Sequence, residues 1–337
     1  MMKEAIKKIS EGQSLTVEEA KAATMELLSG EATQAQIGAY LTALRMKGET
    51  LEEIIGSAMV LRDKAEHITP KVENYIDFVG TGGDGSNSFN ISTTAAFVCA
   101  GAGLPVAKHG NRAISSKSGA GDCLEALGIN IMAEPEKVER EVEEVGIGFM
   151  FAPTFNKSMR YVGQARAEMG IRSIFNILGP LANPSGAKRQ LIGVYSPKLT
   201  ETIAKALPEL GVERALVVSS VNGMDEISTA EDTQISELRD GKVVTYTVTP
   251  EQYGFKRVST QELKGADGAG NAEITKAILS GKDKGAKRDI VLLNAGAALY
   301  ISGVAESVEA GIKIAEETID SGRAMEKLES LVEFSNK

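Results

Sequence analysis

Two glycine-rich segments hold the residue types best suited to chemistry in this chain. The first reads Gly-Thr-Gly-Gly-Asp-Gly at 80–85, and the second, at 108–122, opens with Lys-His-Gly-Asn-Arg and carries a further cation at Lys117. Each follows a short apolar run and precedes a helical pattern. A glycine-rich turn at a helix N-terminus presents backbone N–H groups to phosphate. Two such segments, one of them cationic, predict a substrate with separate phosphate groups.

An acidic pair supplies a second kind of chemistry. Asp225-Glu226 follows the apolar run 214–219 across Asn222-Gly223. Carboxylates just past the end of a strand can hold Mg²⁺, directly or through its water molecules. An ordinary solvated acidic turn is the alternative, but the two phosphate segments favour magnesium because polyphosphate substrates normally bind with it. We expect the pair at the exposed rim of a cleft.

Three further groups leave their roles open. The segment Asn90-Ile91-Ser92-Thr93-Thr94 opens a helix, and its hydroxyls could cap that helix, hold a phosphate or a metal-bound water, or do both. His109 lies inside the second glycine-rich segment, where contact with substrate is as compatible with its position as a structural role. The acidic run 134–144 is expected to be the exposed face of an amphipathic helix without function.

Composition narrows the class of protein. The chain has 337 residues and a formal net charge of −9, which argues against general affinity for nucleic acid or for an anionic membrane. Its only two cysteines, Cys99 and Cys123, stand in apolar helical contexts, so we expect buried free thiols. No apolar segment reaches membrane-spanning length, and we expect a cytoplasmic protein.

The first 67 or so residues predict a small helical unit. Three helix starts have capping-box spacing, at Thr16-x-x-Glu19, Thr33-x-x-Gln36 and Thr50-x-x-Glu53. So short a bundle must bury its apolar stripes against the rest of the chain or against a second subunit. Pro70 and its polar neighbours resemble a linker.

From about residue 75, strand-like runs alternate with helical patterns, which is typical of a mostly parallel sheet with helices on both faces. Two stretches interrupt the alternation: 233–248, which predicts a β-hairpin around Arg239-Asp240-Gly241-Lys242, and about 155–180, which is helical, polar and suited to pack back onto the N-terminal helices. The candidate strands are 75–79, 104–108, 147–151, 190–195, 214–219 and 289–293, and the candidate helices include 92–102, 135–145, 198–210, 271–280, 305–321 and 323–334.

Taken together and in this order, these segments resemble the anthranilate phosphoribosyltransferase family. The resemblance runs through both glycine-rich segments, the acidic pair, the stretch from Arg166 to Pro184 and Asn294-Ala295-Gly296, and it covers nearly the whole chain. Pyrimidine nucleoside phosphorylases share the fold and normally carry an additional C-terminal domain. The resemblance implies an α/β fold of the nucleoside phosphorylase and phosphoribosyltransferase type. It implies a small helical domain at 1–70 and about 155–180, a large α/β domain at 71–154 and 181–337, and a homodimer formed through the helical domains.

The resemblance also implies a site and a reaction. In this reaction the phosphoribosyl group of 5-phosphoribosyl 1-diphosphate passes to anthranilate in tryptophan biosynthesis. The transition state resembles an oxocarbenium ion, and the configuration at C1 of the ribose is inverted. Lys108 and Asp84 are the implied catalytic residues, Mg²⁺ is implied at Ser92, Asp225 and Glu226, and anthranilate at Gly80, Asn111 and Arg166. The implied donor site comprises Gly80, Gly83, Asp84, Ser88, Asn90, Ile91, Ser92, Thr93, Lys108, His109, Gly110, Asn111, Arg112, Ala113, Ile114, Ser115, Ser116 and Ala120.

Three positions depart from the family pattern. Ala120 stands where the family usually has serine, Asn156 where it commonly has the histidine of His-Pro-Ala-Met, and Gln164 where it has the proline of Pro-Val-Arg. The last two lie on the acceptor side. Two other functions therefore stay open at this point: transfer to another aromatic or heterocyclic amine, and a catalytically inactive relative that only binds.

Overall fold

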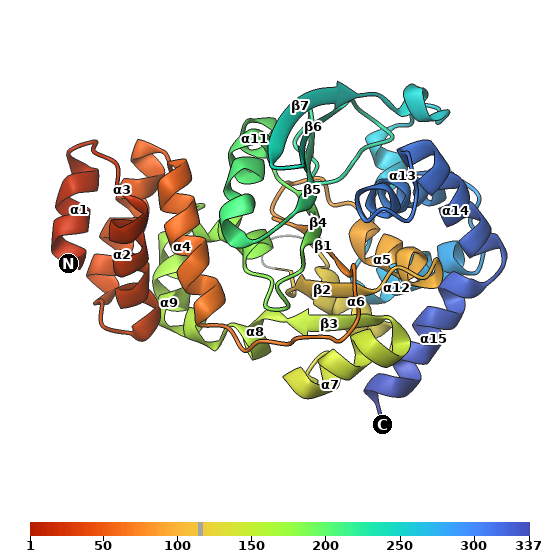
Figure 1. The fold of residues 1–337 in the computed structure, drawn as a ribbon, viewed down its shortest axis with the longest axis horizontal. Coiled ribbons are helices and arrows are strands. Elements are labelled where there is room, and N and C mark those ends of the chain that lie inside the picture. The colour runs from red at the N-terminus through yellow and green to blue at the C-terminus, as the bar shows by residue number, and fades with distance from the viewer. Residues whose placement is uncertain (114–116) are drawn as a thin grey trace.

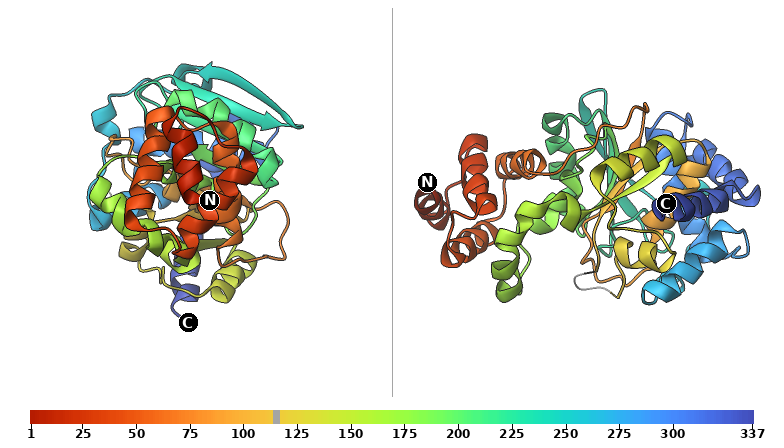
Figure 2. Two further views of the ribbon diagram at one scale, coloured as in Figure 1. Left: turned by 90° about the vertical axis from the view of Figure 1, so that its left-hand side faces the viewer. Right: turned by 90° about the horizontal axis from the view of Figure 1, so that it is seen from below.

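The computed structural model describes residues 1–113 and 117–337. Ile114, Ser115 and Ser116, which the sequence assigns to the donor site, lie outside the described residues. The N-terminal helices form a projection at one end of the molecule, and the sheet with its covering helices forms the larger body at the other (Figures 1 and 2).

Four helices make up the N-terminal unit: α1 (Met2–Ser10), α2 (Val17–Ser29), α3 (Gln34–Lys47) and α4 (Leu51–Asp63). All three predicted capping boxes are confirmed, at Thr16, Thr33 and Thr50, each with its partner three residues further on. These caps satisfy backbone N–H groups that the first turn leaves without an intrahelical partner. Local sequence therefore defines where each of these helices begins.

One seven-stranded sheet organises the larger body, in the order β3-β2-β1-β4-β5-β6-β7. The five strands from β3 to β5 run parallel, and β6 and β7 form the predicted antiparallel hairpin. Because the parallel strands share one direction, the loops that follow β1, β2, β4 and β5 meet at one edge of the sheet. The strands are β1 (Ile76–Gly80), β2 (Val106–Gly110), β3 (Ile147–Phe151), β4 (Arg189–Gly193), β5 (Arg214–Ser220), β6 (Thr233–Arg239) and β7 (Lys242–Val248).

Helices cover both faces of this sheet. On one face, α5 (Ile91–Gly101), α12 (Gly268–Leu279), α13 (Ala286–Ile301), α14 (Val308–Asp320) and α15 (Arg323–Ser335) share a core with Phe78 and Leu216. On the other, α7 (Pro135–Arg140) lies against β3, and α11 (Pro197–Ala206) lies against β5 and β6 (Figure 1). Consecutive residues of β1, Phe78 and Val79, belong to different cores because they point to opposite faces of the sheet. The predicted architecture of a helical unit beside a mostly parallel α/β sheet is confirmed.

One predicted strand is wrong. Residues 289–293 lie inside helix α13, where Ile290, Val291, Leu292 and Leu293 are all buried. A helix that is apolar on every side has no amphipathic period, so a five-residue window cannot distinguish it from a buried strand. The helix is central because α5 and α14 both pack against it.

The stretch 155–180 is helical and contains no strand, as predicted. It comprises the end of α8 (Ala152–Phe155), α9 (Arg160–Met169), α10 (Phe175–Leu178) and two 3₁₀ turns, at Lys157–Met159 and Gly179–Leu181. Helix α9 packs against α2 and α3, and Figure 1 shows it beside the N-terminal helices. No helix in the described part of the chain is both long and apolar enough to cross a membrane. Cys99 and Cys123 are buried free thiols, as expected.

The acidic run 134–144 is not a uniformly exposed face. Helix α7 passes into a short π-helix, Glu141–Val145, and the Glu141 side chain is buried with one carboxyl oxygen that has no partner among the described residues. Burial raises the pKa of Glu141 to about 8, although Lys137 and the backbone N–H of Phe149 oppose the rise. The wider π turn is the physical reason that the helical period fails here.

This burial predicts a pH-dependent stability difference. The folded protein retains the Glu141 proton up to about pH 8, whereas the unfolded chain releases it near pH 4, so wild-type stability falls as pH rises between these values. Glu141→Gln cannot titrate, and its melting temperature relative to wild type should rise across that interval. Thermal melts at a series of pH values measure this, with the exposed Glu144→Gln as control. A difference that does not vary with pH would contradict the assignment.

Candidate functional site

A single pocket at the carboxyl edge of the sheet gathers the predicted donor and metal residues. Every one of those residues that the structure describes lines it, including Asp84, Lys108, Asp225 and Glu226. Arg166 does not line it. The lining also includes residues that the predicted site did not name, namely Val79, Thr81, Gly82, Ser86, Asn87, Phe89, Ser118, Gly119 and Asn176. Four of these lie inside the two glycine-rich segments and four directly flank the first, so position in the sequence was the available signal; Asn176 gave no such signal.

Close backbone approach positions Asp225. A Cβ atom added to Gly80 would lie 2.4 Å from Asp225 Oδ2, and one added to Gly193 would lie 1.6 Å from the Asp225 carbonyl oxygen. These two glycines stand opposite one another on the parallel strands β1 and β4. The backbone N–H of Gly82 then donates to Asp225 Oδ2 at 2.8 Å. Glycine at 80 and 193 is therefore what lets this carboxylate enter the pocket.

Three carboxylates converge there and repel one another. Burial and the facing Asp84 carboxylate raise the pKa of Asp225, and burial with Asp225 raises the pKa of Glu226. Asp84 Oδ2 is buried and accepts no hydrogen bond from the described residues. Acidic oxygens that are held together without enough donors fit a hard divalent cation. The pair is half-buried inside the pocket and does not lie on an exposed rim, which corrects the expectation from sequence.

The start of helix α5 is capped from a distance. No side chain of Asn90–Thr94 caps it; instead the backbone N–H of Ser92 donates to Glu226 Oε1 at 3.1 Å. Capping by the local hydroxyls is therefore ruled out for this helix, and the Ser92 hydroxyl stays turned toward Lys108 Nζ, 3.5 Å away. A carboxylate at a helix N-terminus is also favoured by the helix dipole.

Lys108 is the buried cation of the pocket. It lies on β2, its side chain is nearly inaccessible, and Nζ donates to the carbonyl of Phe78 on the neighbouring strand. Burial lowers its pKa, while Asp77, Glu226 and Asp225 oppose that change. The geometry places a positive charge between the acidic cluster and the sheet edge, where it can balance anionic oxygens.

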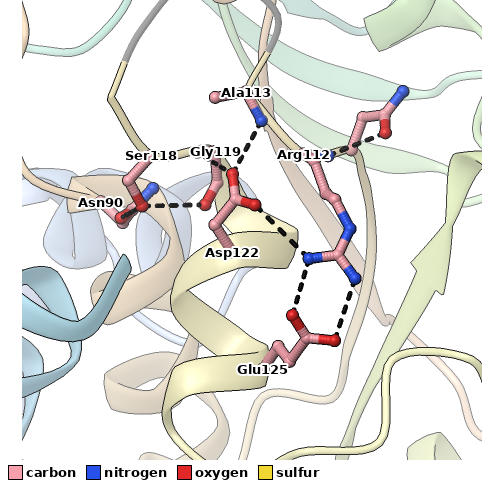
Figure 3. Close-up of polar contacts among 8 residues, drawn as sticks. Asn90, Arg112, Ala113, Ser118, Gly119, Asp122 and Glu125 are labelled. Atoms are coloured by element: carbon pink, nitrogen blue, oxygen red, sulfur yellow. Dashed lines mark hydrogen bonds and ion pairs between the residues drawn. The ribbon is translucent and has the colours of Figure 1, made fainter. Parts of the chain in front are cut away.

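Asp122 connects two positions within the second glycine-rich segment, Ala113 and Gly119. Its Oδ2 accepts from the backbone N–H groups of Ala113 and Gly119, both at 2.8 Å (Figure 3). Ser118 Oγ donates to Asn90 Oδ1 at 3.1 Å, which joins this segment to the start of α5. Asp122 belongs to α6 (Ala120–Ala126), so a helix side chain determines where the segment lies.

Arg112 is fully engaged by acids in this state. Its two terminal nitrogens donate to the two carboxylate oxygens of Glu125 at 2.7 and 2.9 Å, and one of them lies 3.5 Å from Asp122 (Figure 3). The guanidinium also stacks over Phe151 at 5.6 Å. This bidentate geometry orients Arg112 at the pocket wall, and a phosphate bound there would compete with Glu125 for it.

Removal of the Asp122 carboxylate should weaken the second segment as an anion site. Asp122→Ala leaves the Ala113 and Gly119 N–H groups without their shared acceptor, and we expect roughly tenfold weaker binding of phosphoribosyl diphosphate. Calorimetric titration measures this. Ser307→Ala removes a helix N-cap of α14 remote from the pocket and serves as control. Unchanged affinity in Asp122→Ala would show that the hydrogen bonds of Asp122 do not organise the anion site.

Arg172 contacts the first glycine-rich segment, although the sequence did not indicate a role for it. It donates to the carbonyl of Gly83 in the first glycine-rich segment and stacks over Tyr195 at 4.1 Å. The backbone N–H of Tyr195 in turn donates to Thr81 Oγ1 at 3.1 Å. These contacts connect the segment after α9 to the first glycine-rich segment.

The acceptor-side residues occupy three different environments. Arg166 is half-buried, stacks over Phe175 at 5.3 Å, and its side chain has no hydrogen bond or ion pair among the described residues; burial lowers its pKa. Gln164 is exposed and donates to Glu168 on the same helix. Asn156 is buried, 4% exposed, and lies 3.0 Å from His109. On the donor side, the third departure, Ala120, lines the pocket as the first residue of α6 and has no hydroxyl to offer.

Comparison with known proteins identifies the family. A family model described as the glycosyl transferase family helical bundle domain matches residues 3–65, and one described as its a/b domain matches residues 72–325. Anthranilate phosphoribosyltransferase from Acetivibrio thermocellus is 54% identical over 336 residues, which cover 100% of this chain and 97% of that protein. The chain belongs to the anthranilate phosphoribosyltransferase family.

Solved structures of this family have the same fold. Anthranilate phosphoribosyltransferase from Thermus thermophilus superposes with a TM-score of 0.94 at 41% identity, and the match covers 99% of each chain. The Saccharomyces cerevisiae anthranilate phosphoribosyltransferase in complex with PRPP and Mg gives a TM-score of 0.91 at 29% identity, over 99% of this chain and 98% of that one. The family resemblance and the fold expected from the motifs are both confirmed.

Proposed function

We infer that this protein transfers the phosphoribosyl group of 5-phosphoribosyl 1-diphosphate to anthranilate, with release of diphosphate. The observation that carries the proposal is the pocket itself, in which two glycine-rich segments, a buried lysine and three carboxylates meet at one sheet edge. Full-length identity of about half to proteins named for this activity supports it. The substrate is a small molecule; neither nucleic acid nor a membrane is required as a partner.

The donor would lie across the two glycine-rich segments. Backbone N–H groups of the left-handed glycines Gly83 and Gly85 can face phosphate oxygens, whereas the N–H of Gly82 already donates to Asp225. Lys108 and Arg112 supply positive charge from the second segment, with Arg112 exchanging Glu125 for phosphate. We propose that all residues of the donor site named from the sequence bind phosphoribosyl diphosphate, and that Asp84 lies where the diphosphate meets the magnesium ion.

Magnesium fits the acidic cluster. Asp225 and Glu226 would hold it, with Asp84 and the Ser92 hydroxyl near enough to bind its waters, because these oxygens crowd together with too few donors of their own. When bound, the ion would neutralise charge on the diphosphate leaving group. The Saccharomyces cerevisiae structures determined with PRPP and Mg, and with Mg bound, support the presence of the ion.

The residues of the pocket act by position and charge. The proposed reaction breaks the bond from C1 of the ribose to the diphosphate oxygen and forms a bond from C1 to the amine nitrogen. An arylamine is a sufficient nucleophile without strong base assistance, so Lys108 and the glycine N–H groups serve the departing anion. Exclusion of water protects the donor from hydrolysis, and the helical unit beside the pocket is the element suited to provide it.

Anthranilate would be held through its carboxylate by Arg166, with Asn111 and Gly80 at the boundary with the donor. Arg166 supports this role because it is a desolvated guanidinium without an acid partner among the described residues. Phe175, on which it stacks, is followed directly by the pocket residue Asn176. A carboxylate arriving at Arg166 would gain a charge-assisted hydrogen bond beside the pocket.

We also propose the domain limits and the assembly expected from the sequence. The small domain comprises residues 1–70 and about 155–180, and the large domain comprises 71–154 and 181–337; contacts of α9 with α2 and α3 support this division. Homodimerisation through the helical domain and a cytoplasmic location complete the proposal. The exposed Met46 at the end of α3 supports the assembly, and the buried free cysteines Cys99 and Cys123 support the location.

Donor binding should depend on magnesium. Calorimetric titration with phosphoribosyl diphosphate should give saturable binding in millimolar Mg²⁺, and EDTA should abolish most of it, because diphosphate and the carboxylates repel each other without the cation. Release of diphosphate with a panel of aromatic amines then tests the acceptor. No binding of the donor in magnesium would overturn the proposed activity, and turnover with another amine but not anthranilate would overturn the acceptor.

A further inference from the structure

Asn156 and His109 form a buried polar pair behind the pocket wall. Asn156 Nδ2 lies 3.0 Å from His109 Nε2, and both side chains are 4% exposed. His109 follows Lys108 at the end of β2 and lines the pocket, whereas Asn156 stands between α8 and the 3₁₀ turn that leads into α9. Because Asn156 does not line the pocket, its departure from the family pattern acts through His109.

The protonation of the His109 ring follows from its contact with Asn156. Asn156 Nδ2 faces His109 Nε2 at 3.0 Å, and an amide NH₂ group only donates, so Nε2 accepts this hydrogen bond. In a neutral imidazole the proton then lies on Nδ1.

The surroundings exclude the doubly protonated ring. Burial is the largest influence that lowers the pKa of His109, to about 4, and the cations of Lys108 on β2 and Arg62 on α4 lower it further. Asp77 on β1 lies nearby, but its Oδ1 accepts from the backbone N–H of His109 and not from the ring. Nε2 therefore stays unprotonated and accepts from the neutral Asn156 side chain.

We propose that Asn156 is a positioning residue that holds His109 as a neutral imidazole protonated at Nδ1, so that this ring at the pocket wall neither takes up nor releases a proton near neutral pH. His109 then contributes shape and its backbone, and neither accepts nor supplies a proton in the reaction. The consequence for catalysis depends on the proposed function, whereas the state of the ring does not.

Nitrogen NMR tests the ring directly, because the chain contains only two histidines, His67 and His109. In protein labelled with ¹⁵N-histidine, His67→Gln assigns the two spin systems. We expect His109 to show one protonated nitrogen at Nδ1 and one bare nitrogen at Nε2, with no change between about pH 6 and about pH 8. A proton at Nε2 instead, or titration with a midpoint near the ordinary value, would overturn the proposal.

Two variants separate this role of Asn156 from packing alone. Asn156→Asp has nearly the same shape but can only accept, so it should draw a proton onto Nε2 and give a doubly protonated His109 at about pH 7. Asn156→His can still donate and should keep the wild-type ring state, which makes it the conservative rescue. A wild-type ring state in Asn156→Asp would show that Asn156 does not determine it.

Kinetics provide a second measurement that can fail independently. In the wild type, titration of His109 should change kcat/KM for anthranilate by less than about twofold across pH 6 to 8. In Asn156→Asp, kcat/KM should depend on pH over the same range. A protein with the expected NMR spectrum but no turnover would overturn the proposed activity and leave the ring assignment intact. A bell-shaped dependence of wild-type kcat/KM on pH that disappears in His109→Gln would overturn the proposal that the His109 ring stays neutral.

Discussion

Replacement of both Asp225 and Glu226 by alanine should lower turnover by roughly a hundredfold or more, an increase in the activation barrier of about 3 kcal/mol. These carboxylates face Asp84 inside the pocket, where we propose that magnesium binds. Without them the charge of the leaving diphosphate would have no cation anchored beside it. Steady-state kinetics at saturating magnesium measure the loss.

The fold should survive this double change. The raised pKa values of Asp225 and Glu226 mean that their ionised forms destabilise the metal-free protein, so alanine relieves repulsion. At about pH 8 and without magnesium, the melting temperature of the double variant should not fall below that of wild type. Addition of magnesium should raise the melting temperature of the variant less than that of wild type. The control replaces two consecutive exposed acidic residues of α14, Glu316 and Glu317, together by alanine. Near-wild-type turnover in the pocket double variant would reduce the pair to an acidic turn.

Arg166→Ala should raise the KM for anthranilate by roughly ten- to a hundredfold and leave donor affinity nearly unchanged. A charge-assisted hydrogen bond to a carboxylate contributes about 1.5–3 kcal/mol, and Arg166 has no competing acid among the described residues. The split between the two substrates is the diagnostic result, since loss of packing on Phe175 would affect stability before selectivity. Initial rates with each substrate varied in turn provide both constants.

Arg160→Ala is the matched control for that experiment. Arg160 lies on the same helix, α9, and also stacks on an aromatic ring, that of Tyr161 at 4.8 Å, but it is exposed, whereas Arg166 is half-buried. Its substitution should change neither KM by more than about twofold. Equal KM values for anthranilate in Arg166→Ala and Arg160→Ala would remove Arg166 from the acceptor site.

Much of the fold could be predicted from the sequence because its signals are local. The capping boxes at Thr16, Thr33 and Thr50 each involve residues three apart, and the hairpin around Asp240-Gly241 depends on a short turn. The glycine-rich segments are likewise recognisable from a few consecutive residues. Such patterns reflect short-range hydrogen bonds and backbone preferences, which act before distant parts of the chain meet.

The failures have equally definite causes. Residues 289–293 lack a helical period because α13 is buried on all sides, and Glu141 departs from its expected exposed face because the helix widens into a π turn. Neither burial nor the π turn is encoded in a short window of residue types. In both places tertiary packing overrides the local pattern.

For the site, the sequence by itself determined which residues are present, and the tertiary structure decided what each one faces. It identified Asp225, but only the approach of β1 to β4 shows that Gly80 and Gly193 make room for it. It flagged Asn156 as an acceptor-side departure, but only the folded chain turns this side chain toward His109 and away from the pocket. The reason is physical: an isolated side chain carries its chemistry, whereas its direction, burial and pKa arise from groups tens of residues away.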